Sequence, residues 1–391
     1  MARVRRGLLA ITLYGIIQMQ DLPMNSKPRI GISARGLGEV VSGPNSYTED
    51  FTRELIRQAR DYEIHVYYNS SGSLGIFEDV PEHLVPGSNI LLWDHVLLPQ
   101  QMKRDGISLA IFPKGTISVA PPCPAIPIML DLGYFYDKLN PYKPLNTMYM
   151  KRAMRFSANR AVSIFTISEH TRQDVIRLFQ ISPEKVLNIF GAASGSYRPV
   201  RDTSVLNDVR IRYNLEEPFI FFPTSITPRK NFPRLLDAFE LVKDKIPHHM
   251  YFTGSVSWNS NTIIQRLNGP ISERVHQLGK VPFKDMAALY TLAQFTIYPS
   301  LLEGLGLPVL EAFQCGSPVI TSGETSLPEI AGDAALIVNA YSTDSIAQAL
   351  IRLATDTGLR SELRRKGFEQ TKLFTWEKTV SKALKHIATK I

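Results

Sequence analysis

Residues 298–312 read YPSLLEGLGLPVLEA and contain the pattern that decides the fold. An apolar strand pattern ends at Tyr298, two glycines follow, and Pro308 opens a helical pattern. Gly304 and Gly306 remove side chains where a ligand has to approach the backbone, and Pro308 suits the first turn of a helix. Because a helix N-terminus offers free amides and a partial positive charge, it suits a phosphate. The segment therefore predicts an α/β unit whose loop binds an anionic ligand.

Two glutamates flank this loop. Glu311 is expected in the first turn of the helix, where a carboxylate would repel a phosphate, so we expect it to accept hydrogen bonds from a neutral diol such as a ribose. Glu303 precedes the glycines and is expected to hold sugar hydroxyls. The structural alternative is a tight turn in which Glu311 stabilises the helix dipole.

Residues 223–232, PTSITPRKNF, contain a basic pair between another strand and helix. Arg229 and Lys230 at a helix N-terminus oppose the macrodipole by roughly 0.3–1 kcal/mol each. An anion bound between them and the helix would make the arrangement favourable. Arg binds phosphate through two hydrogen bonds, and Lys adds a point charge. A pair of solvated surface charges is the alternative.

The rest of the chain continues the α/β pattern, with apolar runs of strand length between helical patterns. Because the runs are apolar on consecutive positions, they indicate parallel strands covered on both faces. Helical crossovers then give doubly wound sheets that bind ligands beyond the carboxyl ends of their strands. The predicted strands are 29–33, 63–68, 90–93, 109–112, 126–130, 164–167, 186–190, 219–222, 250–253, 295–298, 318–321 and 335–338. The predicted helices are 47–60, 145–162, 232–243, 286–293, 308–315 and 343–355.

The length of 391 residues exceeds one ordinary hydrophobic core, which predicts two domains. The pattern breaks near 197–212, so we expect a first domain over 26–198 and a second over 199–375. Residues 1–25 mimic a signal peptide but are expected to be a non-folded extension or an upstream start, with a membrane-touching leader or a cleaved signal as alternatives. No apolar run is long enough to span a membrane.

Composition excludes several classes of site. Cys123 and Cys315 are the two cysteines, which rules out a disulfide framework and a Cys-built metal centre and fits a reducing cytosol. The eight His show no metal-ligand spacing, so no metal is expected. The net charge of +8 fits nucleic acid, an anionic membrane or phosphorylated substrates.

Six cations and no acids lie in 138–160. Lys151, Arg152 and Arg155 fall within an arc of about 100° on the expected helix, with Met and aromatic residues between them. This composition suits contact with an anionic bilayer, with a solvated outer face and a buried Met side as the alternative. Nucleic acid is disfavoured because no recognised binding module accompanies the charge.

Taken together, these segments resemble the retaining nucleotide-sugar glycosyltransferases of family 4, which have the GT-B fold. Glu303 and Glu311 match the family's Glu-x7-Glu signature, and 229–231 match its basic pair. The runs GSPVIT at 316–321, LPEIAGDAA at 327–335 and FTWE at 374–377 match its downstream sequence. The resemblance covers nearly the whole second half of the chain.

The resemblance implies an α/β GT-B architecture of two doubly wound, Rossmann-like domains facing a central cleft. The second domain would bind a GDP- or UDP-linked sugar without a cofactor, and helix 376–391 would pack back on the first. Arg229 and Lys230 would neutralise the diphosphate leaving group. Glu311 would bind the ribose and Glu303 the donor sugar. The expected backbone and base contacts come from Val281, Gly304, Leu305, Gly306 and Leu307.

The first half resembles the family less closely. Gly43 stands where the family has a glycine-rich loop facing the donor phosphates, although a plain strand–helix loop also explains it. The family's His-Asp is Leu130-Asp131 here, so Asp131 is a catalytic candidate beside a cap or turn role. Ser168 matches the family's serine-containing turn, and a helix N-cap explains it equally well.

The expected function is therefore retaining, metal-independent transfer of a hexose of the mannose or glucose type to a hydroxyl acceptor. The expected setting is polysaccharide, lipopolysaccharide or glycolipid assembly on the cytoplasmic face of a membrane, with peripheral contact through 138–160. Two alternatives stay open. One is a nucleotide-sugar epimerase of GT-B type, and the other a degenerate, non-catalytic glycan-binding homologue, which only the missing His at Leu130 favours.

Overall fold

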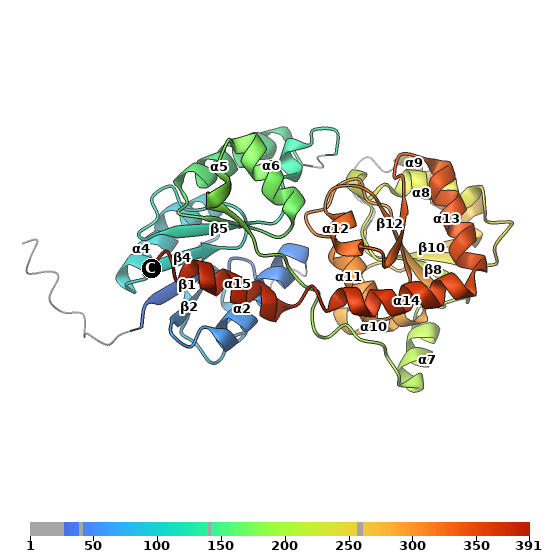
Figure 1. The fold of residues 1–391 in the computed structure, drawn as a ribbon, viewed down its shortest axis with the longest axis horizontal. Coiled ribbons are helices and arrows are strands. Elements are labelled where there is room, and N and C mark those ends of the chain that lie inside the picture. The colour runs from blue at the N-terminus through green and yellow to red at the C-terminus, as the bar shows by residue number, and fades with distance from the viewer. Residues whose placement is uncertain (1–26, 39–41, 140–141, 256–260) are drawn as a thin grey trace, which may run out of the picture.

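The computed structural model describes residues 27–38, 42–139, 142–255 and 261–391, which fold around two parallel sheets (Figure 1). The extension expected over 1–25 lies outside these residues. The first sheet has the strand order β3-β2-β1-β4-β5-β6-β7. Its strands are β1 (Arg29–Ser33), β2 (Glu63–Tyr68), β3 (Glu82–Leu84), β4 (Leu109–Phe112), β5 (Ala125–Met129), β6 (Ile164–Thr166) and β7 (Val186–Asn188).

The second sheet repeats this order as β10-β9-β8-β11-β12-β13. All four residues of β8 are fully buried, as expected for a parallel strand covered on both faces. The strands are β8 (Phe219–Phe222), β9 (His249–Phe252), β10 (Val275–Gln277), β11 (Phe295–Tyr298), β12 (Val319–Ser322) and β13 (Ala335–Val338). Each sheet thus reverses its strand order once, between β1 and β4 and between β8 and β11.

Helices cover both sheets (Figure 1). The first domain contains α2 (Gly43–Gln58), α3 (Ile90–Leu92), the π-helical η2 (Trp93–Leu97), α4 (Leu98–Arg104), α5 (Pro144–Arg160) and α6 (Glu169–Phe179). The chain then continues through α7 (Thr203–Arg212), α8 (Phe232–Glu240), α9 (Asn261–Leu267), α10 (Phe283–Leu292), α11 (Leu307–Gln314), α12 (Leu327–Ala331), α13 (Thr343–Thr355), α14 (Thr357–Thr371) and α15 (Trp376–Ile387). In the part of the chain that the structure describes, no helix is long and apolar enough to cross a bilayer.

The predicted strand at 90–93 is wrong, because these residues are helical. The Asn89 side chain accepts hydrogen bonds from the amides of Leu91 and Leu92, at 3.0 and 3.1 Å, and so caps a helix. The edge of the sheet is formed instead by the short strand β3, which the apolar pattern did not indicate. A brief apolar run does not by itself distinguish a strand from a helix.

The other predicted strands form, with ends shifted by at most two residues. The first helix begins at Gly43 rather than Tyr47, because the Ser42 side chain caps it by accepting from the Asn45 amide at 3.4 Å. The expected boundary at 198 falls between β7 and α7.

The last helix, α15, lies against α2 of the first domain, where Figure 1 shows it in red beside the blue helix. The Gln58 side chain donates to the carbonyl of Glu377 at 3.1 Å, and the rings of Trp376 and Tyr47 meet edge-on at 5.1 Å. The Ser163 hydroxyl and His386 Nε2 lie 2.8 Å apart. The chain therefore passes from the first domain to the second and back again.

Candidate active site

The densest group of predicted site residues lies where the second sheet reverses its strand order. Arg229 and Lys230 belong to the turn after β8, and Glu303 follows the neighbouring β11. Lys230 Nζ donates to Glu303 Oε1 at 2.6 Å and also to the hydroxyl of Tyr298. Lys230 is 8% exposed and Glu303 7%, so Lys230 is not a solvated surface charge.

The buried pair sets the charge of the glutamate. Burial alone would raise the pKa of Glu303, but the cations of Lys230 and Arg229 outweigh it and hold that pKa below its ordinary value. Glu303 is therefore ionised and held in place by Lys230, ready to accept hydrogen bonds from hydroxyl groups.

Arg229 reaches the first domain. Its Nη1 lies 3.1 Å from Asp131 Oδ2, while Asp131 Oδ1 accepts from the Gly133 amide at 2.8 Å. The expected turn role of Asp131 is confirmed, because one oxygen shapes the turn after β5, while the other oxygen faces the second domain. The ion pair joins the carboxyl-end edges of the two sheets.

Gly304 lies directly against the first domain. A Cβ atom there would stand 1.9 Å from the Leu130 carbonyl oxygen, and the Thr171 hydroxyl donates to the Gly304 carbonyl at 3.4 Å. Gly306 has φ +96° and precedes α11, and a Cβ atom there would stand 2.6 Å from the Leu327 side chain. The fold therefore requires both glycines, in addition to the ligand approach that the sequence suggested.

Glu311 lies one helical position further along α11 than expected, just past the first turn. The helix begins at Leu307, one residue before the predicted start, and so its first turn ends before Glu311 and contains no acid. The expected first-turn position, and with it the dipole-stabilising alternative, is therefore wrong. Glu311 Oε2 instead accepts from the Tyr290 hydroxyl at 2.7 Å, and burial raises the pKa of Glu311 to about 7.

The remaining predicted residues are more dispersed. Ser168 is buried and caps α6, because its hydroxyl accepts a hydrogen bond from the Thr171 amide at 3.1 Å. The N-cap role is therefore sufficient to explain the serine at this position. Gly43 is exposed at the start of α2, and Val281 is half-buried between β10 and α10. Leu305 is buried and Leu307 partly so, on either side of Gly306.

Sequence reasoning missed one further contact between the domains. Glu329 on α12 accepts two hydrogen bonds from the first amides of α6, those of Glu169 and His170, both at 2.7 Å. A carboxylate at a helix N-terminus is favoured by the dipole and the free amides. The segment 327–335 carried the family resemblance, but only the packing of the two domains reveals this role.

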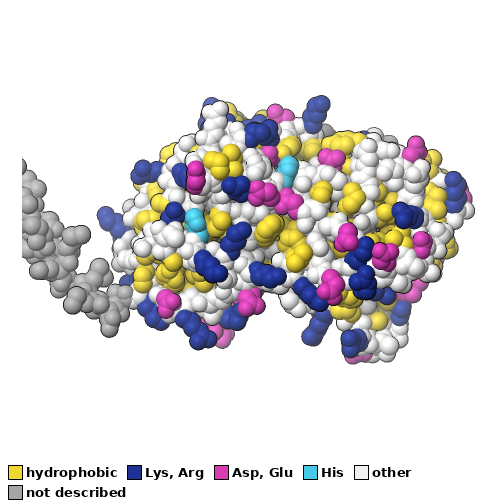
Figure 2. Space-filling model, viewed as in Figure 1, with side chains coloured by type: hydrophobic (Ala, Val, Ile, Leu, Met, Phe, Trp, Pro, Cys, Tyr) yellow, Lys and Arg dark blue, Asp and Glu magenta, His cyan; other side chains and the backbone are white. Residues whose placement is uncertain are grey.

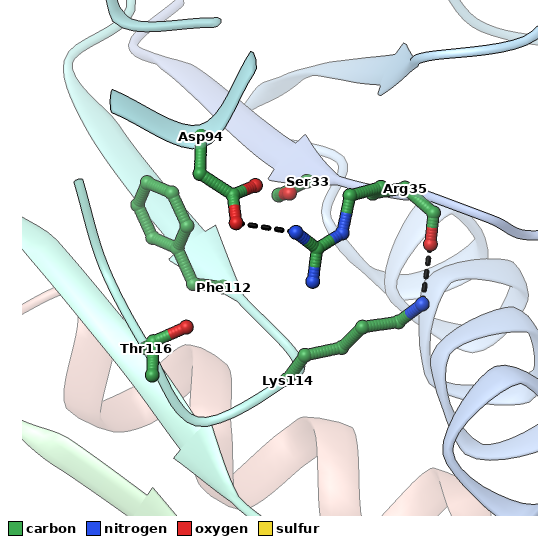
Figure 3. A pocket seen from close by; sticks show the side chains of 6 residues that line it. All are labelled: Ser33, Arg35, Asp94, Phe112, Lys114 and Thr116. Carbon is green, nitrogen blue, oxygen red and sulfur yellow. Dashed lines mark hydrogen bonds and ion pairs between the residues drawn. The ribbon is translucent and has the colours of Figure 1, made fainter. Parts of the chain in front are cut away.

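A polar pocket lies where the first sheet reverses its order (Figure 3). Arg35 follows β1 and pairs with Asp94 of η2, and Lys114, which follows β4, donates to the Arg35 carbonyl. Burial raises the pKa of Asp94 against the opposing effect of Arg35. Ser33, Phe112 and Thr116 complete the lining. Since Asp131 follows the adjacent strand β5, the pocket lies on the sheet edge that meets the second domain.

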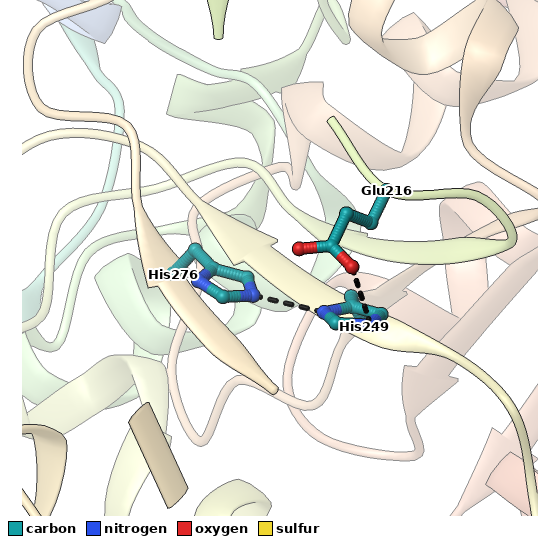
Figure 4. Close-up of side chains that lie close together, drawn as sticks. All are labelled: Glu216, His249 and His276. Carbon is teal, nitrogen blue, oxygen red and sulfur yellow. Dashed lines mark hydrogen bonds and ion pairs between the residues drawn. The ribbon is translucent and has the colours of Figure 1, made fainter. Parts of the chain in front are cut away.

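A third cluster lies at the opposite end of the second sheet (Figure 4). Candidate ligand atoms of Glu216, His249 and His276 lie within 4.8 Å of one another, although the sequence shows no metal-ligand spacing. His249 Nδ1 and His276 Nε2 are 2.9 Å apart, and burial lowers the pKa of both imidazoles. The first domain has a matching pair, in which His65 Nδ1 and His83 Nε2 are also 2.9 Å apart. Because His249 begins β9, this cluster is remote from the carboxyl ends of the strands.

Comparison with known families identifies the second domain. Residues 207–370 match the family model described as glycosyl transferases group 1. This part of the chain is similar to the group 1 glycosyltransferases, and we call it the group 1 domain. The group 1 domain contains both the basic pair after β8 and the two glutamates around α11.

Two curated relatives extend the comparison. The O-antigen chain mannosyltransferase B of Escherichia coli is 31% identical over 240 residues, which are 60% of this chain and 63% of the relative. The serotype-specific mannosyltransferase WbdA of Escherichia coli is 32% identical over 243 residues, which are 60% of this chain and 29% of the relative. Each match thus spans less than two thirds of the relative's own length.

A solved structure matches both domains at once. Anabaena HepE in complex with UDP and glucose superposes with a TM-score of 0.72 over 93% of this chain and 100% of that one, at 14% identity. With the two parallel sheets described above, this likeness confirms the expected α/β fold of GT-B architecture.

Proposed function

We propose that the protein is a retaining glycosyltransferase that moves a hexose from a nucleotide diphosphate to a hydroxyl acceptor. The observation that carries the proposal is the set Arg229, Lys230 and Glu303 at the strand reversal of the group 1 domain, in contact with Asp131. Two cations and a held carboxylate suit a diphosphate joined to a sugar. The mannosyltransferase relatives support a mannose-type hexose.

Each group would have a distinct role. Arg229 would exchange its contact with Asp131 for the diphosphate and stabilise the negative charge that grows as the bond to the anomeric carbon breaks. The acceptor oxygen would bond to that carbon on the same face, and its proton would leave with the diphosphate oxygen. Glu303 would accept hydrogen bonds from the sugar, and Glu311 from the ribose, while the amides of 304–307 face sugar and phosphate.

The basic pair supports a reaction that needs neither a metal ion nor a cofactor. Its cations supply the positive charge that a metal would otherwise place beside the diphosphate. We therefore expect transfer to proceed at an undiminished rate in excess chelator. The proposed donor is a GDP- or UDP-linked sugar.

The pocket of the first domain supports a sugar acceptor. Its paired Arg35 and Asp94 offer both donors and acceptors to hydroxyl groups, and it lies on the edge that carries Asp131. We place this acceptor in polysaccharide, lipopolysaccharide or glycolipid assembly at the cytoplasmic face of a membrane. The cationic segment 138–160 would make the peripheral contact with an anionic bilayer.

The test is transfer by the purified protein from GDP-mannose, UDP-glucose and related donors to a mannoside acceptor, with the anomeric configuration of the product read by NMR. We expect retention, and strong loss of activity in Glu303→Gln and Arg229→Ala. An inverted product, or near-wild-type turnover in Arg229→Ala, would contradict the proposal. Isomerised donor without an acceptor would indicate the epimerase, and donor binding without turnover the non-catalytic homologue.

A further inference from the structure

The helical segment that replaces the predicted strand carries an unusual number of exposed apolar side chains. Ile90, Leu91 and Leu92 are 56%, 49% and 49% exposed, and Val96 is 39% exposed. The segment is nevertheless well anchored, because Trp93 is fully buried and its Nε1 donates to the Val85 carbonyl at 2.8 Å. These side chains are therefore held in solvent by a fixed backbone.

Helix α5 adds a second exposed apolar face. Leu145, Met148 and Tyr149 are 78%, 46% and 36% exposed, and Phe156 is 41% exposed. Their spacing places them on one side of the helix, whereas Met154, Ser157 and Ala158 form its buried side. The alternative to membrane contact was a solvated outer face with a buried Met side; Met154 is buried as that alternative expects, whereas Met148 is exposed.

The two exposed faces are joined. His95 of η2 lies 3.2 Å from the Tyr149 hydroxyl through its Nε2 and accepts from the Val119 amide at 3.3 Å through its Nδ1. Val119 is itself 54% exposed. We call the combined surface the apolar face; its residues are Ile90, Leu91, Leu92, Val96, Val119, Leu145, Met148, Tyr149 and Phe156. A contiguous exposed apolar surface of this kind marks an interaction site.

Positive charge borders this face. Arg152 and Arg155 of α5 are exposed, and the helix contains no acid. Lys151 is partly neutralised by Asp137, whose Oδ1 lies 2.7 Å from its Nζ. Figure 2 shows Lys and Arg side chains at the top of the first domain, over the region where Figure 1 shows α5 and α6, as well as elsewhere on the same face. Apolar residues beside a cationic helix side match the headgroup boundary of an anionic bilayer.

The same segment reaches the pocket of the first domain. Asp94 stands between the buried Trp93 and the linking His95, and Figure 3 shows its carboxylate turned toward Arg35. A bilayer in contact with Leu92 and Val96 would therefore lie beside the pocket.

We propose that α3–η2 and α5 form a membrane-docking face, which inserts its apolar side chains at the headgroup level of an anionic bilayer and brings the pocket to lipid-linked sugars. The proposal deepens the membrane contact of the proposed function and rests on it for the nature of the acceptor. It adds apolar anchors outside 138–160, at Val119 and in the segment 90–96.

The test is co-sedimentation of the full chain with vesicles of phosphatidylcholine, with and without phosphatidylglycerol. We expect binding that requires phosphatidylglycerol and falls about tenfold or more in Leu91→Glu/Leu92→Glu. The matched control is Ile211→Glu/Leu373→Glu, which changes two side chains that are 80% and 60% exposed beyond the first domain. This control should bind as the wild type does. Arg152→Glu/Arg155→Glu should lose the dependence on phosphatidylglycerol.

Undiminished vesicle binding by Leu91→Glu/Leu92→Glu would overturn the proposal, as would absence of wild-type binding. Light scattering provides a further check, since a dimer that this variant dissociates would make the face a contact between two copies. Transfer to a soluble mannoside separates the two proposals. Absence of this transfer in the wild type would contradict the proposed function. The Leu91→Glu/Leu92→Glu variant should still transfer to the soluble mannoside.

Discussion

Lys230 and Glu303 depend on each other at the scale of single residues. Replacing Lys230 with Met would leave the Glu303 carboxylate buried without its partner, 2.6 Å away in the wild type. Breaking a buried pair in this way costs about 3–5 kcal/mol of unfolding free energy. Removing both charges costs less, because no unpaired ion remains.

We therefore expect Lys230→Met to lower stability strongly and Lys230→Met/Glu303→Gln to recover most of it without recovering donor binding. Urea unfolding and donor titration measure the two properties. Equal stability of Lys230→Met and the double variant would show that the pair is not energetically coupled.

Glu311 predicts a pH dependence of stability. Burial raises its pKa from 4.5 to about 7 in the folded state, so folding favours the protonated form. The resulting stability is fully present below pH 4.5 and is lost as the pH rises through about 7. Over that window the slope is about 1.4 kcal/mol per pH unit.

The expected result is a steeper loss of unfolding free energy with rising pH in the wild type than in Glu311→Gln, which carries no titrating group there. Parallel curves would contradict the raised pKa. A ribose diol that donates to the ionised carboxylate would also make donor affinity increase with pH in the wild type.

At the scale of elements, the loop between β11 and α11 touches the first domain through Gly304. The Cβ atom of Gly304→Ala would collide with the Leu130 carbonyl, 1.9 Å away. Because backbone cannot yield as a flexible side chain does, the two domains would separate at this point. We expect donor binding to survive and transfer to be lost.

Donor affinity and single-turnover transfer test this expectation separately. Gly195→Ala is a suitable control, because nothing lies within 4 Å of the added atom. Loss of donor affinity in Gly304→Ala, with transfer at saturating donor preserved, would contradict the interdomain explanation.

The elements themselves were largely predictable from sequence. Consecutive apolar residues predicted β8 and its neighbours, and the rule that ligands bind beyond strand ends placed Arg229 near Glu303. The pattern failed at 90–93, where the Asn89 cap and the buried Trp93 determine a helix. Such a short run lacks the periodicity that would separate the two structures.

At the scale of the whole molecule, contacts between the domains could not be predicted. Glu329 binds the first amides of α6, and Arg229 binds Asp131, across 160 and 98 residues of sequence. Neither pair has a local pattern, because the positions meet only after both sheets have formed. The sequence therefore indicated important residues of the group 1 domain but not the residues of the first domain that they contact.

Glu329 predicts how strongly the domains hold together. Charge-assisted hydrogen bonds to two amides, both 2.7 Å long, would be lost in Glu329→Ala. We expect a larger radius of gyration in small-angle scattering and a lower kcat with a nearly unchanged donor dissociation constant. Glu362→Ala, which removes an exposed pair with Lys366, should change neither. An unchanged radius of gyration in Glu329→Ala would show that other contacts suffice.

The path of α15 has a consequence for synthesis on the ribosome. Val380, Ala383 and Ile387 are fully buried, and their helix lies against α2 of the first domain. Domains generally fold in order as the chain emerges. Here the first domain is translated before the second but lacks its closing helix until the second has been made. Its apolar surface must therefore stay protected through that interval, and the second domain would fold before the first is complete.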